Sequence, residues 1–282
     1  LSFRDERSGS CISNAGRGFK PAGISYFYWR PYMSRWRAAA IHLGFSLVIA
    51  TALFALTFFL WYPSPYYAAA GASFLWFLLV GIDVVIGPFL TLLVFKVGKP
   101  GLKFDMVFIV FAQLAALIYG FSVIAEARPA YVVFAVDRFN VVPANWVVKD
   151  SLNRVKYPEF EKMPWTGPIL ASVKLPEDRE KAKELMFSAL QGYDVETHPE
   201  YFVPYLDLKD QMLAKALPLS ELLAKYNEKR EQLLSHIEGT GLAVEQLVYL
   251  PMTATRQDMA IVLDAKTAEI ITTLPVDPWF GG

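Results

Sequence analysis

The first pattern along the chain is a long stretch without charge. No Asp, Glu, Lys or Arg occurs in Ala38–Ile82, a run of 45 residues. A helix needs ~20 mostly apolar residues to cross the hydrocarbon core of a bilayer, so this stretch can hold two spans. Residues 61–67 divide it, because two prolines end the first helix and aromatic rings favour the membrane–water interface. We therefore predict spans over 38–61 and 71–95.

A third apolar stretch follows a short basic turn. The turn, residues 96–103, contains three lysines, and the apolar stretch after it predicts a third span over 104–125. Seven Lys and Arg residues precede the first span, whereas the 62–67 loop has none. Positively charged loops stay on the cytoplasmic side. We therefore expect the N-terminus in the cytoplasm and residues 129–282 outside it.

After residue 128 the pattern changes to short strands and amphipathic helices. The predicted strands cover residues 131–136, 169–173, 247–251, 259–263 and 269–274. Apolar residues at helical spacing predict helices over 177–191 and 219–237. The last two strands are expected to pair as a hairpin across 264–268. The fold class is therefore a membrane protein, with three transmembrane helices in region 33–128 and a C-terminal α+β domain over 129–282.

Residues 1–32 differ from the rest of the chain, since they show neither an apolar core nor a signal-peptide pattern. Met33-Ser34-Arg35-Trp36-Arg37 directly before a span is typical of a natural N-terminus. We expect residues 1–32 to be a disordered upstream extension. The alternative is a disordered cytoplasmic arm of the native chain.

Composition and charge agree with this division. Of the 282 residues, 54% are hydrophobic and 19% are charged, against ~25% charged in a soluble domain; the mean hydropathy is +0.31. The net charge of zero conceals two opposed halves. Residues 1–128 contain 11 Lys/Arg and 5 Asp/Glu, whereas residues 129–282 contain 16 Lys/Arg and 22 Asp/Glu. An acidic outer domain does not favour nucleic-acid binding. The lone Cys11 excludes an internal disulfide framework and a cysteine-rich metal site.

Motifs for enzymes and cofactors are scarce. The sequence contains no Walker A loop, GxGxxG, HExxH or GxSxG, and its three histidines are dispersed. We expect no catalytic residue, no metal and no cofactor, and therefore a protein that is not an enzyme. Asp137 and Arg138 could form a catalytic pair, but a turn or a structural ion pair explains them better, because strand neighbours point to opposite faces. His198 precedes Pro199 in a turn-like stretch and predicts a surface histidine.

Two polar residues fall inside the predicted spans. Asp83 lies 12 residues from Phe95, which places it ~18 Å from that end of the helix and near the midplane. Gln113 lies 9 residues from Phe104, or ~14 Å in, in nearly the same layer. An acid at the centre of a span costs about 2.5–3.5 kcal/mol, so it should face protein or water. The two side chains either bond to each other between helices, or offer a polar contact to another protein's helix.

Two further features belong to the spans. Gly87-Pro88 lies one turn beyond Asp83, and Pro88 removes a backbone hydrogen bond, so a kink is expected there. Such a kink could line a partner groove or serve only as a packing bend. His42 lies near the predicted cytoplasmic end of the first span, where snorkelling toward the interface would explain it.

Several blocks of the sequence form a distinctive set. They are MSRWRAA (33–39), WYP (61–63), GIDVVIGPFLTLLVF (81–95), GKPGLKFD (98–105), Gln113-Leu114, Tyr119-Gly120 and ARPAYVVFAVDRF (127–139). This set resembles the TfpX/TfpZ family of type IV pilin accessory proteins. The resemblance runs from Met33 to about Phe139, and more loosely to the C-terminus, and it leaves residues 1–32 outside.

The resemblance implies a non-enzymatic protein of the Gram-negative inner membrane, acting as a chaperone or assembly modulator for a cognate major type IV pilin. Other implied partners are the inner-membrane pilus assembly platform and membrane lipid. The C-terminal domain would be periplasmic and would touch the pilin head. The hypothesised partner-binding residues are Asp83, Gly87, Pro88 and Gln113 in the spans, and Asp137 and Arg138 in the outer domain.

Three alternatives remain open. A membrane-anchored enzyme that modifies pilin would show itself by a mass shift on pilin. A sensor with a periplasmic ligand-binding domain would need a cytoplasmic output module. A small transporter built around Asp83 would lose proton-coupled uptake on Asp83→Asn.

Overall fold

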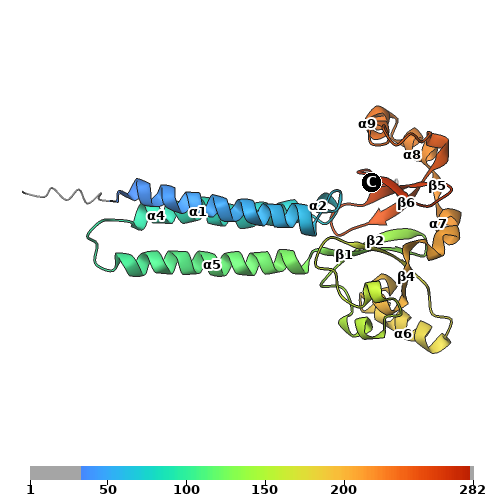
Figure 1. The fold of residues 1–282 in the computed structure, drawn as a ribbon, viewed down its shortest axis with the longest axis horizontal. Helices are drawn as coiled ribbons and strands as arrows, with labels where there is room; N and C mark the ends of the chain where they lie inside the picture. Colours follow the sequence, from blue (N-terminus) through green and yellow to red (C-terminus); the bar gives the residue numbers. More distant parts are fainter. Residues whose placement is uncertain (1–32, 280–282) are drawn as a thin grey trace, which may run out of the picture. The chain divides into compact units, whose positions relative to one another are not determined.

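Three long apolar helices are the first feature of the computed structural model, which describes residues 33–279. The predicted extension over 1–32 lies outside these residues. The helical segments are Arg35–Trp61, Ala72–Val94 and Leu102–Glu126, with 27, 23 and 25 residues. Each is long and apolar enough to cross a membrane, as the sequence predicts. Figure 1 shows the three segments, and a sheet domain follows them in the chain.

The first two segments each contain a π-helical stretch. The first consists of α1 (Arg35–Ala55) and the π-helix η1 (Leu56–Trp61). The second consists of α3 (Ala72–Gly81), the π-helix η2 (Ile82–Ile86) and α4 (Gly87–Val94). The short helix α2 (Tyr66–Ala69) lies between them, and α5 (Leu102–Glu126) is the third segment. Ser34 caps α1, because its Oγ accepts a hydrogen bond of 3.2 Å from the Arg37 amide.

The second segment lies between the other two in the packing. Helix α1 packs against η2 and α4, and α5 packs against α3 and α4. The face of α1 that is buried carries small residues, Ala38, Ser46 and Ala50, which allow close approach of two helix backbones. Large apolar side chains elsewhere on the helices are exposed, as suits contact with lipid.

The C-terminal part of the chain forms one mixed sheet. Its strands are β1 (Pro129–Ala135), β2 (Arg138–Pro143), β3 (Ile169–Val173), β4 (Phe202–Pro204), β5 (Leu217–Pro218), β6 (Leu247–Thr253), β7 (Met259–Asp264) and β8 (Ile270–Leu274). The order is β4-β3-β1-β2-β6-β7-β8, with β5 beside β6. The pairs β1–β3 and β2–β6 are parallel and the others antiparallel. Strand β8 therefore lies at one end of the sheet.

Helices and turns connect these strands. The α-helices are α6 (Arg179–Leu190), α7 (Lys209–Lys215), α8 (Leu219–Lys225) and α9 (Arg230–Ser235). The 3₁₀ turns are η3 (Lys149–Arg154), η4 (Pro158–Phe160), η5 (Val195–Thr197), η6 (Pro199–Tyr201), η7 (Tyr205–Leu208), η8 (Asn227–Lys229) and η9 (Val244–Gln246). The α+β class predicted for this part of the chain is confirmed.

Local sequence patterns predicted much of this domain, including the helix α6 within 177–191, but misjudged the continuity of the helix over 219–237 and the burial of α6. The predicted hairpin is present as β7 and β8, which pair in antiparallel fashion. The helix predicted over 219–237 is interrupted at Tyr226, whose hydroxyl donates a 2.8 Å hydrogen bond to the Asp277 carbonyl. This break allows α8 and α9 to bury leucines in one shared cluster. On α6, Leu185 is buried but Met186 and Leu190 are exposed, so most of its predicted apolar face meets no core.

Two of the aromatic residues that divide the first two spans pack inside the protein rather than at the membrane surface as predicted. Trp61 and Tyr62 are only 2% and 1% exposed. The Trp61 ring stacks on Phe121 of α5 at 4.9 Å, and the Tyr62 hydroxyl donates a 2.8 Å hydrogen bond to the Ile124 carbonyl. Burial raises the pKa of the Tyr62 phenol. These residues hold the end of the first helix against the end of the third.

Two segments of the sheet domain also attach to these helix ends. The Gly167 amide donates a 2.7 Å hydrogen bond to the Leu60 carbonyl, and the Arg256 amide donates a 2.9 Å bond to the Ala69 carbonyl. Arg128 donates to the carbonyls of Ala125 and Pro164, at 2.6 and 3.0 Å. The connection between the first two spans is therefore part of the folded domain rather than a free loop.

His198 is buried, so the surface position predicted for it is wrong. Its exposed fraction is 9%, and its Nε2 lies 2.9 Å from the Ser188 hydroxyl. The pKa of His198 is lowered, mainly because burial disfavours the charged imidazole. A three-residue turn places it against the end of α6, a contact that local sequence does not reveal.

Candidate partner-binding site

A buried carboxyl lies in the middle of the second apolar segment. Asp83 sits in the π-helix η2 and is 9% exposed. Its Oδ1 atom has no hydrogen-bond partner among the described residues. A buried polar atom without a partner is costly, and costliest in an apolar environment. Asp83 therefore carries a buried carboxyl oxygen, Oδ1, that the described helices leave without a hydrogen bond.

Gln113 supplies a second such group on the neighbouring helix α5. Its side chain lies against Gly87, where an added Cβ atom would be 2.0 Å from Nε2. The Gln113 Oε1 atom is buried and, within residues 33–279, also lacks a partner. The hydrogen bond between Asp83 and Gln113, one of the two alternatives left by the sequence, does not form. The reason is their depth, since Gly87 lies four residues, or ~6 Å, further along the helix than Asp83.

Pro88 lies just after a π-helical stretch of the second segment. The sequence predicts a kink where the proline removes a backbone hydrogen bond, and the structure places the π-helix Ile82–Ile86 just before Pro88, at the start of α4. A π-helical turn widens the backbone and commonly marks functional positions in helices. Asp83 lies inside this widened turn, so the irregular backbone and the unsatisfied carboxyl coincide.

A hydrogen bond that the sequence did not predict lies nearby. The His42 Nδ1 atom of α1 is 2.6 Å from the Thr91 hydroxyl of α4. His42 is also close enough to interact electrostatically with Asp83. The snorkelling interpretation of His42 is therefore wrong, because its ring bonds within the helix packing. The recurrence of Ala38, His42 and Ser46 every four residues could have placed all three on one packed face.

Asp137 and Arg138 lie elsewhere, at the turn between β1 and β2. The Arg138 Nε atom is 2.8 Å from the Asp137 carboxylate, which raises the pKa of Arg138. The Arg138 guanidinium also lies 4.5 Å from the ring centre of Trp279. The indole of Trp279 donates a 3.1 Å hydrogen bond to Asp258. The structural ion pair favoured from the sequence is confirmed, and the pair does not join the group around Asp83.

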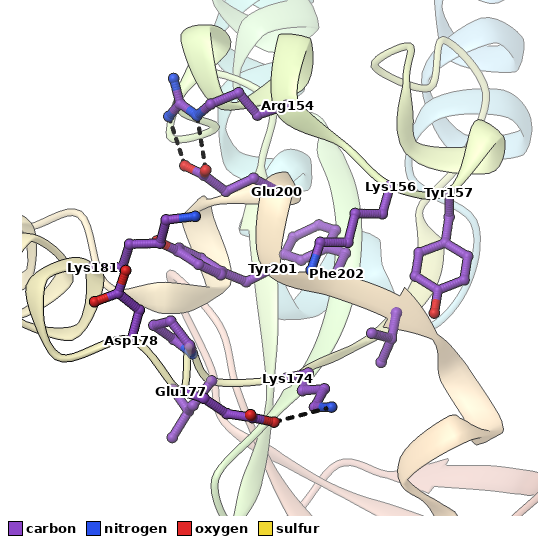
Figure 2. Close-up of a pocket in the computed structure, with 13 residues that line it drawn as sticks. Arg154, Lys156, Tyr157, Lys174, Glu177, Asp178, Lys181, Glu200, Tyr201 and Phe202 are labelled. Atoms are coloured by element: carbon purple, nitrogen blue, oxygen red, sulfur yellow. Dashed lines mark hydrogen bonds and ion pairs between the residues drawn. The ribbon is translucent and has the colours of Figure 1, made fainter.

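A separate cavity of about 470 Å³ lies in the sheet domain, beside β4 and α6. Figure 2 shows Arg154 paired with Glu200 on one side and Lys174 with Glu177 on the other. The two Arg154–Glu200 hydrogen bonds are 2.8 and 2.6 Å, and they lower the pKa of Glu200. Four of the seven charged side chains that line this cavity thus form two ion pairs. In the described part of the chain no group of three or more His, Cys, Asp and Glu side chains could hold a metal ion.

Sequence comparison identifies proteins similar to this chain. A family model described as "Fimbrial assembly protein FimB" matches residues 30–71. The chain is 34% identical to "Fimbrial assembly protein, serogroup I" of Dichelobacter nodosus over 245 residues, which are 86% of this chain and 95% of that protein. The serogroup E1 protein of the same organism matches with the same identity and coverage. "Fimbrial assembly protein, serogroups C1 and C2" is 40% identical over 119 residues, 41% of this chain and 90% of that protein. No solved structure matches.

Proposed function

This chain belongs to the fimbrial assembly protein family, and from this premise we propose that it is an accessory protein for a cognate major type IV pilin. It acts without enzymatic chemistry, as a chaperone or assembly modulator of the TfpX/TfpZ kind, and promotes pilus biogenesis. The observation that carries the proposal is the buried Asp83 carboxyl, left without a hydrogen-bond partner on Oδ1 by the described helices around it.

The proposed location is the bacterial inner membrane, with the N-terminus in the cytoplasm and the sheet domain in the periplasm. Its support is the distribution of charge along the sequence, with lysines in the 96–103 turn and none in the 62–67 loop. In this orientation the chain presents apolar helices to a pilin's transmembrane helix and a folded domain to its head. Lipid surrounds the helices, and the pilus assembly platform is a further candidate partner.

Asp83, Gly87, Pro88 and Gln113 are the proposed contacts for the pilin helix. Gly87 has no side chain, so α5 can approach it closely, and the π-helix before Pro88 supplies irregular backbone. A donor on the partner helix would satisfy Asp83. Hydrogen bonds between membrane helices average ~0.6 kcal/mol and reach ~1.7, which corresponds to ~3- to ~18-fold in affinity. Asp137 and Arg138 are proposed contacts for the pilin head.

The test measures stability and binding in the same variant. If Asp83 serves a partner, Asp83→Ala removes an unsatisfied carboxyl, so the purified chain becomes more stable while pilin co-purification falls ~3- to ~18-fold. Thr91→Ala is the control, because it removes an internal bond to His42 and should lower stability. The opposite result is reduced stability in Asp83→Ala with pilin capture and surface piliation unchanged. It would mean that the carboxyl stabilises the packing of this chain's own helices, and it would refute the site.

A photocrosslinking experiment locates the contact. Probes at Ile82 and Ile86, which are 38% and 47% exposed, flank Asp83. A probe at Phe111 on α5, 69% exposed, is the control on a different helix. We expect pilin in the adducts of the first two positions and lipid at the third. Equal pilin capture at all three positions would contradict a specific groove.

A further inference from the structure

A groove lies where the connection between the first two spans meets the sheet domain. It encloses about 480 Å³, within the ~300–1,000 Å³ usual for binding pockets. One wall is the segment from Ser64 to Ala68, which includes the start of α2. The other wall is β8, through Ile270, Thr272 and Thr273. Because β8 ends the sheet, alternate backbone groups of this strand point away from β7.

The walls of this groove are held in place from both sides. Ala69, directly after the first wall, is fully buried in the core of the sheet domain. Its carbonyl accepts hydrogen bonds from the amides of Arg256 and Gln257, at 2.9 and 3.2 Å. The second wall is part of the antiparallel β7–β8 hairpin. Both walls of the groove therefore belong to anchored segments, and binding there would order few new residues.

A stripe of aromatic side chains on the helices leads into the groove. Tyr67 lines the groove, and its ring centre lies 5.8 Å from that of Phe58 on the first segment. Phe58 in turn lies 4.6 Å from Phe54 and 6.0 Å from Trp76 of α3. The indole Nε1 of Trp76 is buried and has no acceptor within the described residues. Tyr67 and Phe54 remain 40% and 39% exposed, so part of the stripe is open.

The same stripe leads down the second segment toward Asp83. Trp76 and Asp83 are seven residues apart, which is two helical turns, so they lie on nearly the same face. The partner-binding site proposed above and the end of the stripe at Trp76 thus lie on nearly the same side of the second segment, two helical turns apart. An apolar helix that contacts Asp83 and follows the stripe would leave the membrane beside Tyr67.

The chemistry of the groove selects its occupant. Its lining consists of aromatic, aliphatic, proline and hydroxyl side chains with one histidine, His236, and, among the described residues, no carboxylate, lysine or arginine. By contrast, the cavity in Figure 2 is lined by several charges of both signs. A neutral groove suits an uncharged segment of polypeptide, with apolar side chains and hydroxyl or amide groups, better than a charged metabolite.

We propose that this groove binds the segment of the partner protein immediately outside its transmembrane helix, while the helix itself lies along the aromatic stripe. This inference rests on the proposed function and assigns the occupant to the same pilin. The groove would hold the partner at the point where its helix meets its head, and so fix the head relative to the membrane.

The test uses photocrosslinking from Thr272 in whole cells that make the full chain and pilin. A probe at Ile86 in the span reports on the proposed function independently, and a probe at Lys266, in the turn between β7 and β8 but outside the groove lining, is the matched control. We expect Thr272 to capture pilin through the peptide immediately after its apolar helix. Lys266 should capture at least tenfold less.

Filling the groove gives a second measurement. Thr273→Trp should lower pilin co-purification about tenfold, the effect of losing one strong contact. Lys266→Trp should leave it unchanged. Ser64→Trp fills the groove from the opposite wall, and it replaces Thr273→Trp if circular dichroism shows that the strand variant does not fold.

Each outcome bears on the proposal. Pilin captured from both Thr272 and Ile86 supports it. Pilin captured from Ile86 alone overturns the groove inference but leaves the proposed function standing. Pilin captured from neither position overturns both. Lipid or a second copy of this chain in the Thr272 adducts, in place of pilin, also overturns the groove inference.

Discussion

Gly87 is the position where a single methyl group tests the packing of the apolar helices. A Cβ atom there would lie 2.0 Å from the Nε2 atom and 2.8 Å from the Cδ atom of Gln113, far inside van der Waals contact. The clash falls on the end of a flexible side chain, so in Gly87→Ala the Gln113 amide must leave its place beside α4. Because this amide can move aside, we expect a cost of about 1 kcal/mol, at the lower end of the range typical of overpacking.

A double-mutant cycle isolates this contact. Gln113→Ala removes the clashing atoms, so Gly87→Ala should cost much less in that background. The change in helix propensity from Gly to Ala is the same in both backgrounds and cancels in the cycle. We therefore expect a coupling free energy of about 1 kcal/mol between the two positions. Gly81→Ala is the control, since no atom lies within 4 Å of its added Cβ, and its coupling to Gln113 should be near zero.

The assay is denaturant unfolding of the purified chain in detergent, followed by tryptophan fluorescence and circular dichroism. Free energies of unfolding are compared for the four members of each cycle. An equal cost of Gly87→Ala with glutamine and with alanine at position 113 would refute the predicted contact. A coupling of the same size for Gly81→Ala would refute its assignment to this clash.

Three further predictions concern the sheet domain and its attachment. Tyr62→Phe should lower the free energy of unfolding by about 0.5–1.5 kcal/mol, because it removes the hydrogen bond to the Ile124 carbonyl. Denaturant unfolding measures this change, and an unchanged free energy of unfolding would contradict the attachment. Since the pKa of His198 is lowered in the folded state, the unfolded state binds more protons. The free energy of unfolding should therefore fall as the pH drops through ~6.5, the pKa of histidine in the unfolded state. In His198→Gln the melting temperature should fall less steeply as the pH drops than it does in the unsubstituted chain. The same pH dependence in both proteins would exclude His198 as its source. Leu185→Ala should cost roughly 2–5 kcal/mol, whereas Leu190→Ala on the exposed side of α6 should change stability by less than ~0.5 kcal/mol; equal effects in thermal melts would contradict the burial of α6.

Local sequence was enough to predict the three apolar helices and the general class of the second half. Whether a segment can cross a membrane depends on length and on hydrophobicity summed over neighbouring residues, and both can be read locally. The β7–β8 hairpin could be predicted for the same reason, since its strands and turn are contiguous. The depth of Asp83 and Gln113 also came from residue counts, which place Gln113 slightly nearer the 96–103 turn.

Packing between the helices determines which of these groups meet. Gln113 contacts Gly87 rather than Asp83, and His42 bonds to Thr91 rather than reaching the membrane surface. Small differences in helix rotation and depth decide such contacts, and the helical period alone does not reveal them.

The groove beside Tyr67 could not be predicted from local sequence either, because its two walls are far apart along the chain. Its walls come from residues near 66 and near 272, which the mixed strand order of the sheet brings together. Each wall looks ordinary in the sequence, one as a proline-rich loop and the other as a terminal strand. The groove exists only because Ala69 is anchored in the core formed by strands far along the chain, a consequence of packing between segments that have no local relation.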